Sequence, residues 1–270
     1  MRKNKAQINQ EKWAIVTGAS KGIGYGYCKK LLDLGWNVVA VARNTDSLDK
    51  LSKEYTQQIV LKINLDLSDP KNSYKLFEDT KNMPISLIIN NAGRGVLGDF
   101  DKADLEQELN MIDLNIKSLH ILTKLFTQRF SENEIGRIIN IASVVAFLPG
   151  PGFASYYASK AYVQSLGSAI NHELKTKKSK SRVITICPGP LKTGFTQRSR
   201  NELENKTEFT SQSKDVTNFV NISLKKALKA KRRNYFIIGF RNRFLNKLMM
   251  FIPKSWSMNA VYRYNRKNNK

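Results

Sequence analysis

Cysteine and histidine are scarce in this chain, with two of each among 270 residues. Neither Cys28 nor Cys187 has a second cysteine or a histidine at metal-ligand spacing, so the sequence argues against a metal site. We interpret both as small core residues. This cysteine usage is typical of a cytoplasmic protein. Neither His120 nor His172 lies in a motif that would give it a catalytic role.

Long apolar runs are also lacking. No stretch of the sequence approaches the roughly 18 residues that span a bilayer. The basic start of the chain continues into Gln7-Ile8-Asn9-Gln10-Glu11, without the apolar core of a secretory signal. We therefore expect a cytoplasmic protein, with peripheral contact at the inner face of a membrane as an alternative.

Acidic residues are few in the last hundred positions. Residues 171–270 hold 24 Lys/Arg against 5 Asp/Glu, so most of the net charge of +23 lies there. Such a surface attracts anions: an acidic membrane, a phosphorylated substrate or a nucleic acid. A solvated, lysine-rich surface explains the same composition equally well. Because no nucleic-acid motif accompanies the charge, we do not expect nucleic acid as a partner.

Short apolar runs rich in β-branched residues alternate with helical patterns along the chain. Continuous apolar strands separated by helices indicate a parallel sheet that is covered on both faces. A first helix is expected to end at Gly35, and longer helices are expected at about 102–130 and 155–175. The sequence predicts an α/β fold, a single doubly wound Rossmann-type domain with a parallel seven-stranded sheet flanked by helices. The expected strands are 13–16, 37–41, 59–63, 86–90, 137–141, 182–186 and 235–238.

A glycine-rich turn follows the first expected strand, with the sequence Thr17-Gly18-Ala19-Ser20-Lys21-Gly22-Ile23-Gly24. Three positions without side chains let backbone N–H groups approach a dinucleotide pyrophosphate at the positive end of the next helix. Glycines also make ordinary tight turns, so this pattern alone is a weak indicator.

A second motif, Tyr156-Tyr157-Ala158-Ser159-Lys160, places a phenol and an ammonium one helical turn apart. A free tyrosine has a pKa near 10, and a neighbouring positive charge lowers it into a range useful for acid–base chemistry. This pair suits protonation of a carbonyl oxygen. Ser143, thirteen residues before Tyr156, would hold that oxygen. Spacing alone leaves Tyr157 as a rival of Tyr156.

Together these motifs resemble those of the short-chain dehydrogenase/reductase family. Asn90-Asn91-Ala92-Gly93 after the fourth strand and Pro188-Gly189 after the sixth match two further family motifs. The resemblance covers about residues 12–195 by motif and reaches about 239 by strand order. It implies an enzyme that transfers hydride between a nicotinamide cofactor and a CH–OH or C=O group, and it favours Tyr156 over Tyr157. It also implies a homo-oligomer.

The resemblance assigns roles to individual residues. Tyr156 gives the proton in reduction and takes it in oxidation, Lys160 also binds the nicotinamide ribose, and Ser143 holds the substrate oxygen. Asn115 positions a water beside the lysine, with an exposed polar side chain as the alternative. The expected cofactor-binding residues are Gly18, Ser20, Lys21, Gly22, Ile23, Gly24, Arg43, Asp66, Asn91, Gly93, Tyr156, Lys160, Pro188, Gly189 and Thr193.

Charge after the second strand indicates which nicotinamide cofactor is used. The strand runs into Arg43, with no acidic residue before Asp46. In this fold a carboxylate here binds the ribose of NAD, whereas arginine suits the 2′-phosphate of NADP. Arg43 and Lys21 therefore predict NADP (NADPH), with NAD less favoured; two solvated cations are the alternative. Asp66 resembles the family acid that bonds the adenine amino group, and a turn role competes with that interpretation.

The remaining segments bear on the substrate. The apolar run 144–153 suggests a lipophilic carbonyl compound, although packing within the domain explains it equally well. We expect residues 1–240 to form the catalytic domain, with a variable substrate lid at about 193–213. Residues 241–270 are expected to form a basic amphipathic extension. As a helix, 241–252 places apolar side chains on one face, which resembles a membrane anchor; packing on the protein itself gives the same pattern.

These observations predict an NADPH-dependent oxidoreductase that reduces a ketone or aldehyde, or oxidises the secondary alcohol in the reverse direction, with a lipophilic or acyl-type substrate. Two alternatives from other classes remain. One is a non-enzymatic dinucleotide-binding or sensor protein, against which the intact set of catalytic groups argues. The other is a peripheral membrane-binding protein that uses the basic C-terminal half.

Overall fold

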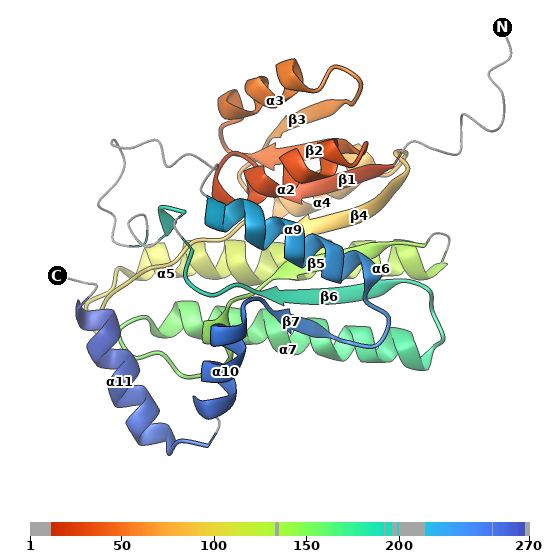
Figure 1. Ribbon diagram of the computed structural model, residues 1–270. Coiled ribbons are helices and arrows are strands. Elements are labelled where there is room, and N and C mark those ends of the chain that lie inside the picture. The colour runs from red at the N-terminus through yellow and green to blue at the C-terminus, as the bar shows by residue number, and fades with distance from the viewer. Residues whose placement is uncertain are drawn as a thin grey trace, which may run out of the picture.

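Seven parallel strands form one sheet in the computed structural model, in the order β3-β2-β1-β4-β5-β6-β7 (Figure 1). The structure describes residues 12–132, 135–191, 193–195, 199, 214–249 and 251–267. The strand order reverses between β1 and β4, the place where doubly wound sheets bind ligands. The predicted fold is confirmed. The strands are β1 (Trp13–Thr17), β2 (Asn37–Ala42), β3 (Val60–Asn64), β4 (Ile85–Asn90), β5 (Arg137–Ile141), β6 (Arg182–Cys187) and β7 (Tyr235–Ile237).

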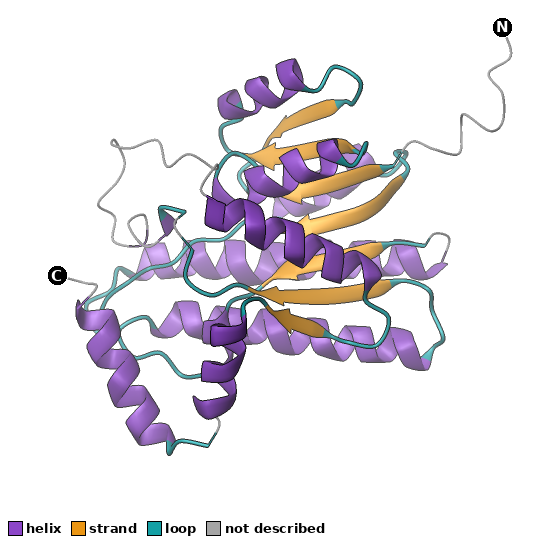
Figure 2. Cartoon of the chain, viewed as in Figure 1, coloured by secondary structure: helices purple, strands orange, loops and turns teal. Residues whose placement is uncertain are grey.

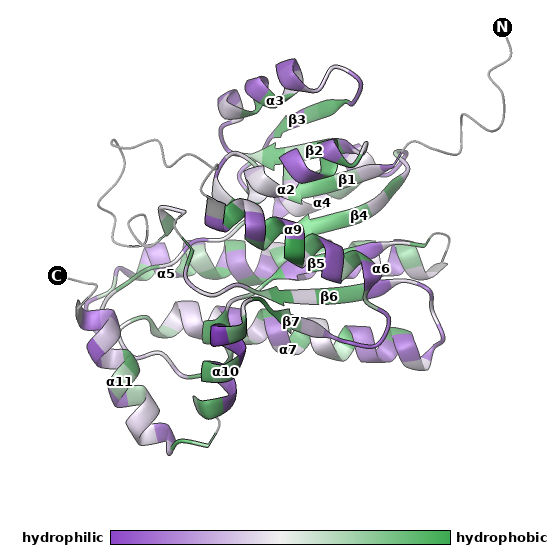
Figure 3. Cartoon of the chain, in the orientation of Figure 1, coloured by the Kyte–Doolittle hydropathy of each residue, from purple (hydrophilic) through white to green (hydrophobic). Residues whose placement is uncertain are grey.

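Helices cover both faces of the sheet (Figure 2). On β1, Ala14 and Val16 pack in the cluster that includes the helices of one face, whereas Trp13 and Ile15 pack in the cluster of the other. Successive strand residues point to opposite faces, so a strand buried on both reads as a continuous apolar run (Figure 3). One face carries α2 (Gly22–Asp33), α3 (Asp49–Glu54) and α9 (Lys214–Lys229), and the other carries α4 (Lys71–Thr80), α6 (Leu119–Glu132) and α7 (Ala154–Thr176).

The first helix, α2, ends as its glycine predicts. Gly35 has a φ of +76°, its N–H bonds Leu32 O at 2.9 Å, and Trp36 N–H bonds Leu31 O at 3.0 Å. These paired bonds form the Schellman motif, which satisfies the last carbonyl groups of a helix.

The long helix expected at 102–130 is divided. It begins as α5 (Leu105–Ile112), where the side chain of Asp104 accepts a hydrogen bond from Gln107 N at 2.8 Å. A π-helical stretch, η2 (Asp113–Ser118), then leads into α6. Such wide turns are frequent at functional sites because they redirect side chains. Asn115 lies within this stretch.

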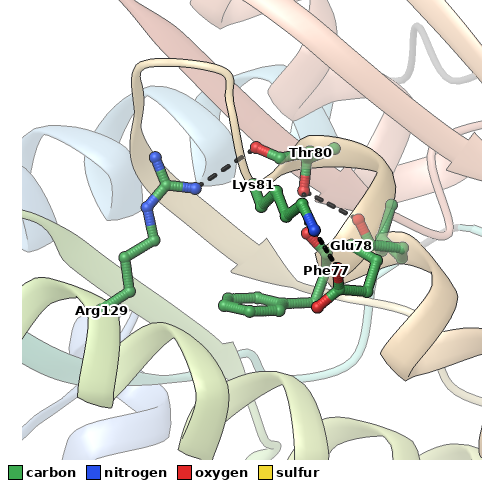
Figure 4. Close-up of polar contacts among 6 residues, drawn as sticks. Phe77, Glu78, Thr80, Lys81 and Arg129 are labelled. Carbon is green, nitrogen blue, oxygen red and sulfur yellow. Dashed lines mark hydrogen bonds and ion pairs between the residues drawn. The ribbon is translucent and has the colours of Figure 1, made fainter.

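Arg129 of α6 fixes the C-terminal end of α4 on this face of the sheet (Figure 4). Its guanidinium donates to Thr80 O at 3.3 Å and to Met83 O at 2.6 Å. The hydroxyl of Thr80 donates in turn to Leu76 O at 2.8 Å. A cation bonded to terminal carbonyl groups also complements the negative end of the helix dipole.

Two helices follow the last strand, α10 (Phe240–Met249) and α11 (Lys254–Lys267). The expectation of one helix over 241–252 is wrong at its end, because Ile252 lies in a turn before Pro253. Proline lacks an N–H group and cannot continue a helix interior. Both helices lie beyond the carboxyl ends of β6 and β7 (Figure 1). Most of the expected lid at 193–213 lies outside the described residues.

Candidate active site

The glycine-rich turn has a tight backbone that favours glycine. Gly18 and Gly22 have φ values of +64° and +53°, and a Cβ added to Gly24 would lie 2.1 Å from Gly18 O. The N-cap residue of α2, Lys21, makes no side-chain capping bond, and the first turn of α2 contains no acidic residue. The positive end of this helix is therefore compatible with a bound phosphate group.

The loop after β4 is tied to this turn. Asn91 Nδ2 donates to Thr17 O at 2.9 Å and to Gly18 O at 3.2 Å. The hydroxyl of Thr17 accepts from the N–H groups of Asn91 and Ala92, both at 3.0 Å. These bonds hold the ends of β1 and β4 together at the reversal of strand order. Thr17 is a residue that motif reasoning left without a role.

Two exposed cations lie at the end of β2 and in the turn. Lys21 and Arg43 are both exposed, and within the described part of the chain neither forms an ion pair. The loop after Arg43 is joined to the turn because Ser47 Oγ donates to Ser20 O at 2.8 Å. Both guanidinium and ammonium groups are thus available to an anion at this edge.

The other expected cofactor residues differ in what they contact. Asp66 Oδ1 accepts from Ser68 N at 2.9 Å and from Ser68 Oγ at 2.7 Å, so its carboxylate stabilises a turn. Thr193 is buried, and a Cβ added to Gly22 would lie 3.3 Å from the Thr193 Cβ. The carbonyl of Pro188 accepts from Val144 N at 2.9 Å. Ile23 is half-buried and packs against the core, and Gly189 lies beside Asn242.

Asn115 is buried and holds the loop that follows Gly93. Its Oδ1 accepts from Arg94 N at 3.0 Å, and its Nδ2 donates to Arg94 O at 2.9 Å and to Ser159 Oγ at 3.1 Å. A Cβ on Gly93 would lie 3.2 Å from Asn115 Oδ1 and 3.3 Å from Lys160 Nζ. The alternative of an exposed side chain is therefore wrong, and Asn115, Gly93 and Lys160 meet at one place.

Tyr156, Ser143 and Lys160 form a buried group. A hydrogen bond joins the side chains of Tyr156 and Ser143. Lys160 Nζ lies 5.8 Å from the centre of the Tyr156 ring and donates to Ile141 O at 3.0 Å. Burial raises the pKa of Tyr156, and the bond to Ser143 opposes this. The expectation that Lys160 lowers this pKa is therefore wrong, because the loss of solvent around the phenol is the largest cause of the shift.

Burial also lowers the pKa of Lys160 to about 8. The unfolded chain keeps this proton up to the ordinary pKa of 10.5, so it binds more protons than the folded chain between these values. The contribution of Lys160 to the free energy of unfolding therefore rises with pH across this window, by about 3 kcal/mol in all.

Urea unfolding of wild type and of Lys160→Met measures this contribution. We expect the difference between their free energies of unfolding to change in favour of the wild type from pH 8 to pH 10. A constant difference would contradict it.

Tyr157 points elsewhere. A hydrogen bond joins its hydroxyl to the side chain of Asn265 in α11, and Asn265 Nδ2 donates to Pro151 O at 2.9 Å. Only Tyr156 of the two neighbouring tyrosines is bonded to Ser143. Asn265, like Ser159, was missed by sequence reasoning, because its partners are far away in the chain.

Apolar side chains surround the Tyr156 phenol. The ring of Phe153 stacks on it at 4.4 Å between centroids, and that of Phe195 lies at 5.2 Å. Val96 and Met111 complete the buried cluster. Across the ranges that the structure describes, no three His, Cys, Asp or Glu side chains are grouped to hold a metal ion.

Comparison with known proteins identifies the family of this chain. The family model described as short chain dehydrogenase matches residues 12–204, more than half of the chain. The chain belongs to the short-chain dehydrogenase family. This dehydrogenase is accordingly an oxidoreductase of alcohol and carbonyl groups, in a family that binds a nicotinamide dinucleotide.

Three relatives show the extent of the likeness. An uncharacterized oxidoreductase of Schizosaccharomyces pombe is 32% identical over 182 residues, which cover 66% of this chain and only 60% of that protein. An NADP-dependent (R)-specific alcohol dehydrogenase of Lentilactobacillus kefiri is 30% identical over 205 residues, 74% of this chain and 80% of that protein. A solved short-chain dehydrogenase from Sphingobium yanoikuyae in complex with NADPH has a TM-score of 0.73 at 28% identity, covering 90% and 96% of the two chains.

Proposed function

We propose that this dehydrogenase uses NADPH to reduce a lipophilic ketone or aldehyde, with Asn115, Ser143, Tyr156 and Lys160 as its working residues. The observation that carries the proposal is the buried, hydrogen-bonded pair of Tyr156 and Ser143 with Lys160 beside it. This pair lies in an apolar cluster, at the same edge of the sheet as the glycine-rich turn.

The proton chemistry follows from these contacts. A raised pKa keeps the Tyr156 phenol protonated at neutral pH, so it is ready to donate its proton to a carbonyl oxygen. Ser143 donates a second hydrogen bond to that oxygen and stabilises its developing negative charge. The nicotinamide, when bound, supplies the hydride. Gly18, Gly22, Gly24 and Asn91 would hold its dinucleotide, because the glycines keep the turn tight at the N-terminus of α2 and Asn91 fixes the turn's backbone.

Asn115 supports the lysine indirectly. Its three hydrogen bonds hold the backbone of Arg94 and the hydroxyl of Ser159 in place. They thereby fix the loop and the part of α7 that lie beside Lys160 Nζ. Lys160 presents a positive charge below the phenol, which favours loss of the Tyr156 proton during transfer. We propose that the water expected beside Lys160 is bound next to Asn115.

Turnover across a panel of carbonyl compounds tests the proposed function. The panel should contain long-chain ketones and 3-oxoacyl thioesters, steroids, sugars and small ketones, and NADPH oxidation is measured beside NADH oxidation. We expect NADPH-dependent reduction of apolar members. Tight NADPH binding without turnover of any member would instead favour a dinucleotide sensor.

Preference for NADPH rests on Arg43 and Lys21, which are exposed and without ion pairs in the described chain. A guanidinium bonded to the 2′-phosphate contributes about 1.5–3 kcal/mol. We expect Arg43→Glu to raise the KM for NADPH about 10- to 100-fold and to leave that for NADH within a few-fold. Lys50→Glu, an equal change of charge on α3, is the control. Equal effects of both variants on NADPH would contradict a specific contact.

We also propose a division of the chain into two parts, with a membrane surface and further copies of the chain as partners. Residues 1–240 would carry the catalytic site, and residues 241–270 would contact a membrane surface from the cytoplasmic side. Assembly into a homo-oligomer is proposed as well, because short-chain dehydrogenases are often oligomeric. Size-exclusion chromatography with light scattering tests that assembly.

A further inference from the structure

Helices α10 and α11 turn polar side chains toward the protein. From α10, Asn246 Nδ2 donates to Val144 O at 3.3 Å, and Asn242 lies against Gly189. From α11, Asn265 is 5% exposed and bonds Pro151 O at 2.9 Å. Val261 adds one apolar contact, to the cluster around Tyr156. Asparagines thus make much of the contact between these helices and the site.

Large apolar side chains of the same segment face outward. An amphipathic helix ordinarily buries such residues and exposes the polar ones, but here large apolar side chains and cations are exposed together. Six large apolar side chains within 17 consecutive positions are far more than the scattered exposed residues of an ordinary surface. The exposed fractions are 75% for Phe240, 58% for Phe244, 53% for Leu245, 45% for Leu248, 86% for Phe251 and 70% for Trp256.

The charge around these exposed residues indicates which kind of partner binds them. No acidic residue occurs from Val216 to Lys270. The cations Arg241, Arg243, Lys247 and Lys254 alternate with the apolar residues, and in the described chain none of them forms an ion pair. A second copy of this segment would bring like charges together, whereas an apolar surface rimmed with anions matches both features.

We propose that the segment Phe240–Trp256 docks on an anionic lipid bilayer and that the carbonyl substrate reaches Tyr156 from that bilayer. No helix in the described part of the chain is both long and apolar enough to cross a membrane, so the contact is interfacial. The aromatic residues enter the lipid headgroup layer and the cations bind lipid phosphates. The source of the substrate rests on the proposed reductase activity, whereas the docking rests on the exposed residues and charges of this segment.

The link to catalysis is the loop between Ser143 and Tyr156. Helix α10 bonds it at Val144 and helix α11 bonds it at Pro151. Asn265 also bonds Tyr157, the neighbour of Tyr156 in the chain. The docking segment is therefore bonded to the loop that precedes Tyr156, and in this proposal a lipophilic substrate leaves the bilayer beside that loop.

Vesicle co-sedimentation of the full chain tests the docking. We expect binding to vesicles of equal parts phosphatidylcholine and phosphatidylglycerol, and at least about tenfold weaker binding to phosphatidylcholine alone. Phe251→Ser with Trp256→Ser should abolish it. Leu34→Ser with Tyr74→Ser removes two apolar side chains elsewhere, which are 50% and 54% exposed, and should have no effect. Equal binding to both kinds of vesicle, or an equal loss of vesicle binding in both double variants, would contradict docking through this segment.

A charge control separates this surface from general attraction. Lys225 and Lys229 line an open depression of about 580 Å³ between α9 and β7. The residues directly before β7 line it too, so it lies at the opposite end of β7 from α10. Arg241→Gln with Lys247→Gln should weaken binding to the anionic vesicles about tenfold or more. Lys225→Gln with Lys229→Gln should leave it unchanged. If the Lys225 and Lys229 variant lost binding and the Arg241 and Lys247 variant kept it, the lipid contact would lie at that depression instead.

Activity then tests the delivery of substrate. A long-chain ketone is dissolved in the anionic vesicles, and a short ketone that the wild type reduces is assayed in buffer. We expect Phe251→Ser with Trp256→Ser to lower turnover of the vesicle-borne ketone at least about tenfold and to leave the short ketone unchanged. Equal turnover of the vesicle-borne ketone would overturn delivery. Failure of the wild type with every member of the carbonyl panel would remove the proposed function, while the sedimentation result would stand.

Discussion

Tyr156→Phe is expected to lower kcat/KM for carbonyl reduction by about 10²- to 10⁴-fold, the contribution of a positioned general acid. The substitution removes the hydroxyl that is bonded to Ser143 and keeps the ring that stacks on Phe153. Because the ring remains, the KM for NADPH and the melting temperature should change little. Steady-state NADPH oxidation with the best substrate of the carbonyl panel measures the effect.

Tyr157→Phe is the matched control for this prediction. It removes the hydroxyl of an equally buried tyrosine on the same helix, but one that is bonded to Asn265 rather than to Ser143. We expect a loss of kcat/KM within about tenfold, through the position of the loop alone. Activity that survives in Tyr156→Phe and disappears in Tyr157→Phe would assign the proton transfer to Tyr157.

Gly24→Ala should abolish measurable NADPH binding and destabilise the protein. The added Cβ would lie 2.1 Å from Gly18 O and 2.6 Å from Asn91 Nδ2, so the turn must open and its bonds to the loop after β4 must break. Overpacking of this kind costs about 1–3 kcal/mol or more. NADPH fluorescence titration and thermal unfolding measure the two effects.

Gly35→Ala serves as the control for Gly24→Ala. Gly35 has a φ of +76° with no atom within 4 Å of an added Cβ, so it tests backbone strain without a clash. We expect it to lower the free energy of unfolding by about 1 kcal/mol and to leave the Kd for NADPH unchanged. Retained NADPH binding in Gly24→Ala would show that the turn does not hold the cofactor.

The arrangement of the core could be predicted from local pattern. Each predicted strand appears within two residues of its expected bounds, because a strand buried on both faces needs a continuous apolar run wherever it occurs. The end of α2 at Gly35 follows likewise from one residue that tolerates a positive φ. The division of α5 and α6 by a π-helical stretch left no such mark, because its sequence is compatible with an ordinary helix.

The amino-acid sequence by itself determined the parallel sheet, the glycine-rich turn and the pairing of a tyrosine with a lysine one helical turn away, since each depends on residues close together in the chain. Only the tertiary structure decided that Tyr156 bonds Ser143 while Tyr157 bonds Asn265, and that burial sets the pKa of Tyr156. It also decided that α10 and α11 turn asparagines inward and Phe251 outward. The contacts of Asn246 and Asn265 join residues about a hundred positions apart. The burial of Tyr156 and the different partners of the two tyrosines depend on the packing around them, which no local pattern contains.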